Sequence, residues 1–173
     1  MVRMENVETI RHYWTHGQSL EAGKLVYESL PAHYRPKWAV NILRLVLSRA
    51  GCETESISQL LRIADHESEW LDAHGAFSDV RSDVLQFDRR YAQYPRDLTE
   101  EENLRWHVLL LAELVAKVTY NATDPPDPFD EDSGWWIAKW LRGFADANWK
   151  DEEFADAAWR ALLFQDTRGN DMI

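Results

Sequence analysis

Hydrophobic residues recur along most of this chain at the three- and four-residue spacing that is typical of amphipathic helices. In residues 5–15, for example, Val7, Ile10 and Trp14 fall on one face and polar residues fall on the other. The same spacing predicts helical segments near residues 5–15, 19–30, 36–50, 55–74, 77–94, 100–118, 133–148 and 151–164. No stretch of useful length alternates hydrophobic and polar residues as a β-strand does. We therefore expect an all-α fold, a compact bundle of seven or eight helices.

Residues of characteristic type mark where several of these helices begin and end. Thr99 and Glu102 have the spacing of a capping box, in which each side chain binds the backbone N–H of the other residue. Ser19 is expected to cap the second helix. Gly51 and Gly75 are expected to end the third and fourth helices, because glycine readily adopts the left-handed conformation of a helix terminus.

One predicted helix is hydrophobic on nearly every side. Between Leu104 and Val118 the apolar run is interrupted by four polar residues, Arg105, His107, Glu113 and Lys117. A helix that is apolar on most of its circumference is usually surrounded by other helices. This segment is therefore expected to lie at the centre of the bundle.

An acidic, proline-rich connection precedes the last two predicted helices. Residues 123–134 read TDPPDPFDEDSG and contain three prolines and five acidic side chains, so they are not expected to be helical. The connection is too short to indicate a domain boundary. Because 173 residues suffice for one ordinary domain, residues 1–173 are expected to form a single all-α domain.

The charge of the chain restricts its partners. It has 30 acidic against 19 basic side chains and a formal net charge of −11. Such a protein repels the phosphate backbone of nucleic acids and anionic membrane surfaces, and attracts positively charged proteins. The same acidity also serves solubility alone. We expect no nucleic-acid and no membrane partner.

Compartment and cofactors are constrained by what the sequence lacks. No hydrophobic run approaches the roughly 18 residues of a membrane span, and the first residues do not resemble a signal peptide. Cys52 is the only cysteine, so neither an internal disulfide nor a cysteine-rich zinc site can form. Nucleophile elbows, glycine-rich phosphate loops and His-Glu-x-x-His signatures are missing as well. We expect a cytoplasmic protein without a cofactor.

Three polar residues fall on or beside hydrophobic helix faces. Glu67 lies at the flank of the fourth segment's apolar face, Asp88 near the centre of the fifth, and His107 on the central helix. Charged groups facing a core need a partner or a metal. The residues are therefore candidates for a catalytic or metal site, with His107 as ligand or general base. Alternatively, Asp88 pairs with Arg49 or Arg81, and His107 binds a backbone carbonyl.

The hydrophobic faces of the predicted helices do not account for all nine tryptophans. Trp135 falls on the polar side of its helix, opposite Trp136, which the pattern assigns to the core face. Trp159 and Leu163 lie nearly opposite the main apolar face of the last helix. Aromatic residues are enriched in protein interfaces. Trp135, Trp159 and Leu163 are therefore the expected partner contacts.

These observations leave three hypotheses for function. The first is a non-enzymatic acidic helical protein that binds another protein with a basic surface, as an inhibitor or immunity protein does. The second is a metal-dependent enzyme whose site comprises Glu67, Asp88 and His107. The third is a homodimeric structural module joined through the last two helices.

Overall fold

The computed structural model describes residues 4–93, 98–123, 132–165, 169–170 and 172, and within them the protein is all-α, as predicted. Two short 3-10 helices accompany the α-helices, and the described residues contain no β-strand. In chain order the elements are α1 (Met4–Thr15), α2 (Ser19–Ser29), η1 (Ala32–Tyr34), α3 (Arg35–Ala50), α4 (Glu55–Ala64), η2 (Glu67–Asp72), α5 (Ala73–Gln93), α6 (Glu100–Asn121), α7 (Ser133–Ala147) and α8 (Glu152–Leu162).

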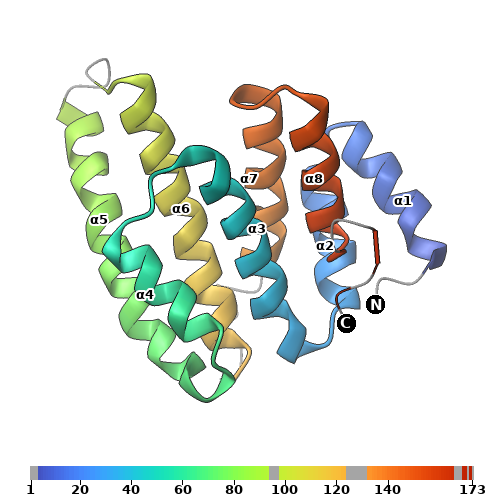
Figure 1. Cartoon of the computed structure of the whole chain (residues 1–173), viewed down its shortest axis with the longest axis horizontal. Coiled ribbons are helices and arrows are strands. Elements are labelled where there is room, and N and C mark those ends of the chain that lie inside the picture. Colours follow the sequence, from blue (N-terminus) through green and yellow to red (C-terminus); the bar gives the residue numbers. More distant parts are fainter. Residues whose placement is uncertain (1–3, 94–97, 124–131, 166–168, 171, 173) are drawn as a thin grey trace.

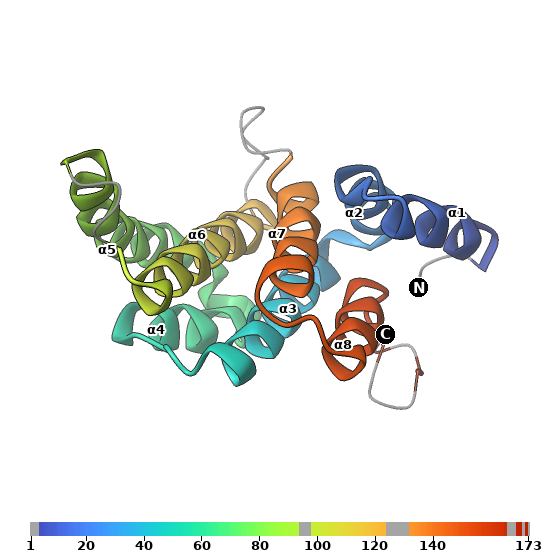
Figure 2. The same ribbon diagram turned by 90° about the horizontal axis from the view of Figure 1, so that it is seen from above.

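The helices form two layers. Helices α5, α6, α7, α2 and α1 lie side by side in that order in the first layer (Figure 1). Helices α4, α3 and α8 form the second layer, which covers one face of the first (Figure 2). Helix α3 contacts α4, α6, α7 and α8, so it joins the two layers at their centre.

Helix α6 has the central position that its sequence predicts, because it contacts α3, α4, α5 and α7. Its capping box is also confirmed. The backbone N–H of Glu102 donates to Thr99 Oγ1 at 3.1 Å, and the N–H of Thr99 donates to Glu102 Oε2 at 3.0 Å. The box satisfies two backbone groups that would otherwise lack partners at the start of this helix.

Trp38 anchors the packing between the layers. Its side chain is fully buried on α3, and the indole Nε1–H donates to the carbonyl of Leu162 at 3.0 Å. Leu162 is the last residue of α8. This hydrogen bond therefore joins the beginning of α3 to the end of the chain's last helix, 124 residues later.

Helices α2 and α7 pack closely because two glycines lie at their contact. A Cβ added to Gly23 would lie 2.5 Å from the Cβ of Ala138 and 3.0 Å from the carbonyl oxygen of Trp135. A Cβ added to Gly134 would overlap the ring of Tyr27. Both glycines are thus required by the close approach of the two helices.

The predicted helix over residues 55–74 is interrupted, which corrects the sequence-based boundary. Helix α4 ends at Ala64, η2 follows, and α5 begins at Ala73 and continues through Gly75, which therefore ends no helix. The interruption buries Trp70, whose Nε1–H donates to the carbonyl of Ala64 at 2.9 Å. In an uninterrupted helix the spacing from Leu60 would place Leu71 on the apolar face, whereas its side chain is 53% exposed in the structure.

Other sequence expectations have mixed outcomes. Ser19 does not cap α2, because it is the first residue of the helix. The N-cap residue is Gln18, and no side chain forms a capping hydrogen bond at this N-terminus. Gly51 ends α3 in the left-handed conformation, as predicted.

Most of the acidic connection, residues 124–131, lies outside the described residues. None of the described helices is long and apolar enough to cross a bilayer.

Candidate functional site

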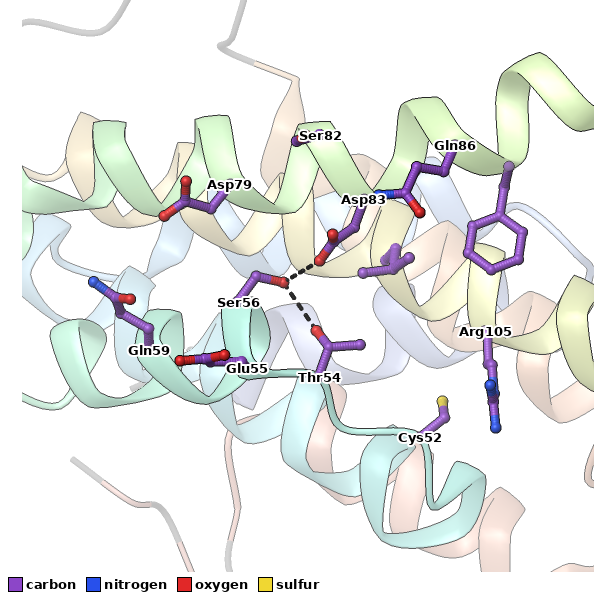
Figure 3. Close-up of a pocket in the computed structure, with 12 residues that line it drawn as sticks. Cys52, Thr54, Glu55, Ser56, Gln59, Asp79, Ser82, Asp83, Gln86 and Arg105 are labelled. Carbon is purple, nitrogen blue, oxygen red and sulfur yellow. Dashed lines mark hydrogen bonds between the residues drawn. The ribbon is translucent and has the colours of Figure 1, made fainter.

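A cleft of about 620 Å³ lies between the beginning of α4, the middle of α5 and the first half of α6. This volume is in the range of ligand-binding clefts. We refer to it as the acidic cleft. Its lining consists of Cys52, Thr54, Glu55, Ser56, Gln59, Asp79, Ser82, Asp83, Gln86, Phe87, Arg105 and Leu109. Figure 3 shows the polar side chains of α4 and α5 on its two sides.

Hydrogen bonds between side chains hold the two sides of the acidic cleft together. Thr54 caps α4 by accepting the backbone N–H of Ile57 at 3.3 Å. Its hydroxyl lies 2.9 Å from the hydroxyl of Ser56, which donates to Asp83 Oδ2 at 2.6 Å (Figure 3). The cap of α4 is thereby connected to α5, and the carboxylate of Asp83 is oriented by this chain of hydroxyls.

The acidic cleft contains an excess of negative charge. In the described part of the chain, no lysine or arginine forms an ion pair with Glu55, Asp79 or Asp83. Arg105 is the one cationic residue of the lining, and its guanidinium pairs with Glu101 at 2.7 Å. Carboxylates that share a cleft without a cation of their own attract one from outside.

Cys52 is at the end of the acidic cleft nearest Arg105 (Figure 3). Its side chain is half-buried, and burial raises the pKa of the thiol, although the charge of Arg105 acts in the opposite direction. A raised pKa keeps the sulfur protonated at neutral pH, whereas a nucleophile or a metal ligand must be a thiolate. The other polar groups of the lining are carboxylates, amides, hydroxyls and the guanidinium of Arg105, and the carboxylates can bind a cationic group.

The three residues expected to form a catalytic or metal site lie on three separate elements. Glu67 is exposed on η2 and does not flank an apolar helix face. Asp88 is on α5 and His107 is on α6. Among the described residues, no group of three or more histidine, cysteine, aspartate or glutamate side chains could hold a metal ion. Glu67, Asp88 and His107 therefore do not assemble into a metal centre.

Asp88 forms an ion pair with Arg81, one of the two arginines expected to pair with it if it is not part of a metal or catalytic site. Its side chain is 34% exposed, so it does not face the core, and it accepts the Nε1–H of Trp106 at 3.0 Å. Arg81 lies 3.9 Å from Asp88 and 3.3 Å from Glu113. Arg49, the other expected partner, pairs with Asp151 at 3.0 Å instead.

His107 is half-buried between two tryptophan rings. Its ring centroid lies 5.8 Å from that of Trp106 and 5.1 Å from that of Trp140. Within the described residues its nitrogens form no hydrogen bond, so the expected bond to a backbone carbonyl is not formed. Burial lowers the pKa of this imidazole from its ordinary value of 6.5, because the charged form loses hydration.

This lowered pKa predicts a pH-dependent stability. Below about pH 6.5 the unfolded chain gains a proton at His107 that the folded protein resists, so stability falls as the pH drops toward the folded-state pKa. We expect NMR titration of the His107 ring to give a pKa below 6.5. Replacing His107→Gln should reduce the loss of stability in that pH range. A ring pKa at or above 6.5 would contradict the prediction.

The expected partner contacts are only partly at the surface. Trp135 and Trp159 are half-buried, and each ring is covered by a cation of the same chain, Lys24 at 4.7 Å and Arg11 at 5.3 Å. Leu163 is 4% exposed and so belongs to the core, which removes it as a surface contact.

The exposed tryptophan of α7 is Trp136, at 37% exposure, and not its neighbour Trp135, contrary to the sequence assignment. The Nζ of Lys139 lies 4.4 Å from the centre of its ring, and its Nε1–H donates to Asp132 at 3.0 Å. The ring that the pattern placed in the core is thus at the surface, where it packs against its own helix.

No protein family model, curated protein or solved structure matches the chain. Only the described residues themselves therefore bear on function.

Sequence reasoning missed the acidic cleft. Glu55, Asp79 and Asp83 each occupy an ordinary polar position on an amphipathic helix, which is what any solvated helix face shows. The three carboxylates share one cleft only because α4 and α5 pack together. The signal available in the sequence was the helix cap at Thr54, which fixes where α4 begins.

Proposed function

We propose that the protein is a non-enzymatic binding protein whose partner is a positively charged protein. The observation that carries the proposal is the acidic cleft, in which Glu55, Asp79 and Asp83 have no cationic partner among the described residues. The cleft receives lysine or arginine side chains of the partner. Their amine or guanidinium groups pair with the carboxylates, and their aliphatic portions pack on Phe87 and Leu109.

The charge of the whole chain supports the same partner. A net charge of −11 accelerates encounter with a basic protein and disfavours acidic ones. The polar lining includes hydroxyl and amide groups that can bind the remaining N–H donors of a guanidinium. An inhibitor that covers the basic site of another protein combines these properties.

The proposal is tested with acetylated tetra-arginine and tetra-lysine amides, and with tetra-serine as the uncharged reference. Both basic peptides are expected to bind saturably and to shift the NMR signals of Ser82 and Gln86. The double variant Asp79→Asn/Asp83→Asn should weaken binding about fivefold, because two charge pairs are lost, one at the exposed Asp79 and one at the half-buried Asp83. Added salt should weaken it further.

A matched control separates the cleft from net charge. The double variant Glu8→Gln/Asp156→Asn removes the same two negative charges from exposed positions on α1 and α8. It should leave the affinity within twofold of the original. Equal losses in the two double variants would show that the peptides respond only to net charge, and an absence of basic-peptide binding would contradict the proposal directly.

A further inference from the structure

A second cavity, of about 520 Å³, lies between the first half of α6 and the last half of α7. We call it the α6–α7 cavity. Its α6 wall is formed by Glu100, Asn103 and His107, whose spacing places them on one face of the helix. The opposite wall comprises Trp140, Gly143, Phe144, Ala147 and Asn148. Polar groups therefore face rings and small residues across a space of ligand size.

Gly143 keeps this cavity open at a cost to its own helix. It lies within α7, its φ angle is not positive, and an added Cβ would meet no atom within 4 Å. Neither backbone conformation nor helix packing therefore requires glycine here, in contrast to Gly23 on α2. Glycine inside a helix is less favourable than alanine. What its missing side chain does provide is free space beside Trp140.

The imidazole of His107 offers unused hydrogen-bonding groups to the α6–α7 cavity. Its nitrogens have no hydrogen-bond partner among the described residues, although the ring is held between Trp106 and Trp140. The lowered pKa keeps it neutral at pH 7, so one nitrogen donates and the other accepts. Asn103 and Asn148 add amide donors and acceptors to the same wall and rim.

The charges around the α6–α7 cavity favour a cation. Glu100 forms no ion pair with a described residue, whereas the next two glutamates pair with Arg105 and Arg90. The cavity also lies at the C-terminal end of α7, which is the negative end of the helix dipole. The face of Trp140 attracts cations as well. The beginning of α6 is the positive end of a helix dipole and so disfavours a cation, but three glutamates in the first turn of α6 offset this positive charge.

We propose that the α6–α7 cavity binds a small organic primary amine that carries a planar ring. The ammonium group lies near Glu100 and the end of α7. The ring packs on Trp140 in the space left by Gly143, and a polar substituent on it bonds to His107. This site shares helix α6 with the acidic cleft but none of its lining residues, and it does not depend on the function proposed for that cleft.

Tryptamine and tyramine are the probes, and each is titrated into the full-length protein by calorimetry and by NMR. We expect one equivalent to bind with a Kd below about 1 mM, with shifts at Gly143 and His107. The uncharged analogue 3-ethylindole should bind at least tenfold more weakly than tryptamine. Affinity equal to that of tryptamine would overturn the assignment of a cation site, and the absence of saturable binding by both amines would overturn the site itself.

Two glycine variants test the location of binding. Gly143→Leu fills the cavity and should raise the Kd of tryptamine at least tenfold. Gly75→Leu makes the same change on α5, where an added Cβ likewise meets nothing within 4 Å, and should leave the Kd within twofold. If Gly143→Leu fails to fold, Gly143→Ala provides the test, with a Kd raised severalfold and an unfolding transition at higher temperature. Unchanged affinity in the folded Gly143 variant would place the amine elsewhere.

Discussion

Replacing Trp38→Ala is expected to lower the free energy of unfolding by about 3–5 kcal/mol, a large share of the 5–15 kcal/mol typical of a domain. The side chain is 0% exposed, so its removal leaves a cavity where α3 joins the two layers. It also leaves the carbonyl of Leu162, which accepts the indole N–H at 3.0 Å, without this donor. Urea unfolding followed by circular dichroism measures the loss.

Two further variants separate the contributions to this effect. Trp38→Phe retains most of the ring but not the N–H donor, and should cost roughly 1–3 kcal/mol. Trp136→Ala removes a tryptophan that is at the surface and should cost less than about 1 kcal/mol. If Trp38→Ala proved no more destabilising than Trp136→Ala, then the described contact between α3 and α8 would be wrong.

The fold class was predictable because the helices carry strong local signals. The spacing of Val7, Ile10 and Trp14 places their side chains on the face of α1 that packs inward. The capping box of Thr99 and Glu102 sets the start of α6 to the residue. Such signals depend on hydrophobic burial and on backbone groups within one turn, so a single sequence contains all the information they need.

The end of α4 at Ala64 could not be predicted from the local sequence, because tertiary packing determines it. The hydrophobic spacing continues from Leu60 and Leu61 to Leu71, so the local pattern favours one uninterrupted helix. Burial of the much larger Trp70 determines the outcome instead, and the chain forms η2 to bring that ring inward. The segment η2 contacts α5 and α6, and tertiary contacts of this kind override local propensity and spacing.

The candidate site was less predictable, since a small error in helical phase changes which side chain is exposed. Successive residues differ by about 100° around a helix, and the exchanged roles of Trp135 and Trp136 correspond to one such step. His107 was singled out by its position on a hydrophobic helix, and the structure places it half-buried beside Trp106 and Trp140. Its neighbours in space, Trp140 and Gly143, come from a helix that begins 26 residues later, and no local pattern connects them.

The substitution Gly23→Ala is expected to lower the free energy of unfolding by about 1–3 kcal/mol, although alanine is the better helix former. The added methyl group would lie 2.5 Å from the Cβ of Ala138 and 3.0 Å from the carbonyl oxygen of Trp135. Neither atom can rotate away, so α2 and α7 must separate, and these helices share one of the largest contacts of the fold. Urea unfolding under the same conditions measures the change.

Gly75→Ala is the matched control for this prediction. Gly75 is also inside a helix and without a positive φ angle, but an added Cβ meets nothing within 4 Å, so alanine should stabilise the protein by about 0.5–1 kcal/mol. Opposite changes in the free energy of unfolding for the same substitution at two helical glycines would isolate the steric cost at Gly23. The double variant Gly23→Ala/Ala138→Gly should recover part of that cost, because it removes the methyl group that is too close. Stabilisation by Gly23→Ala alone would mean that α2 and α7 do not approach as closely as described.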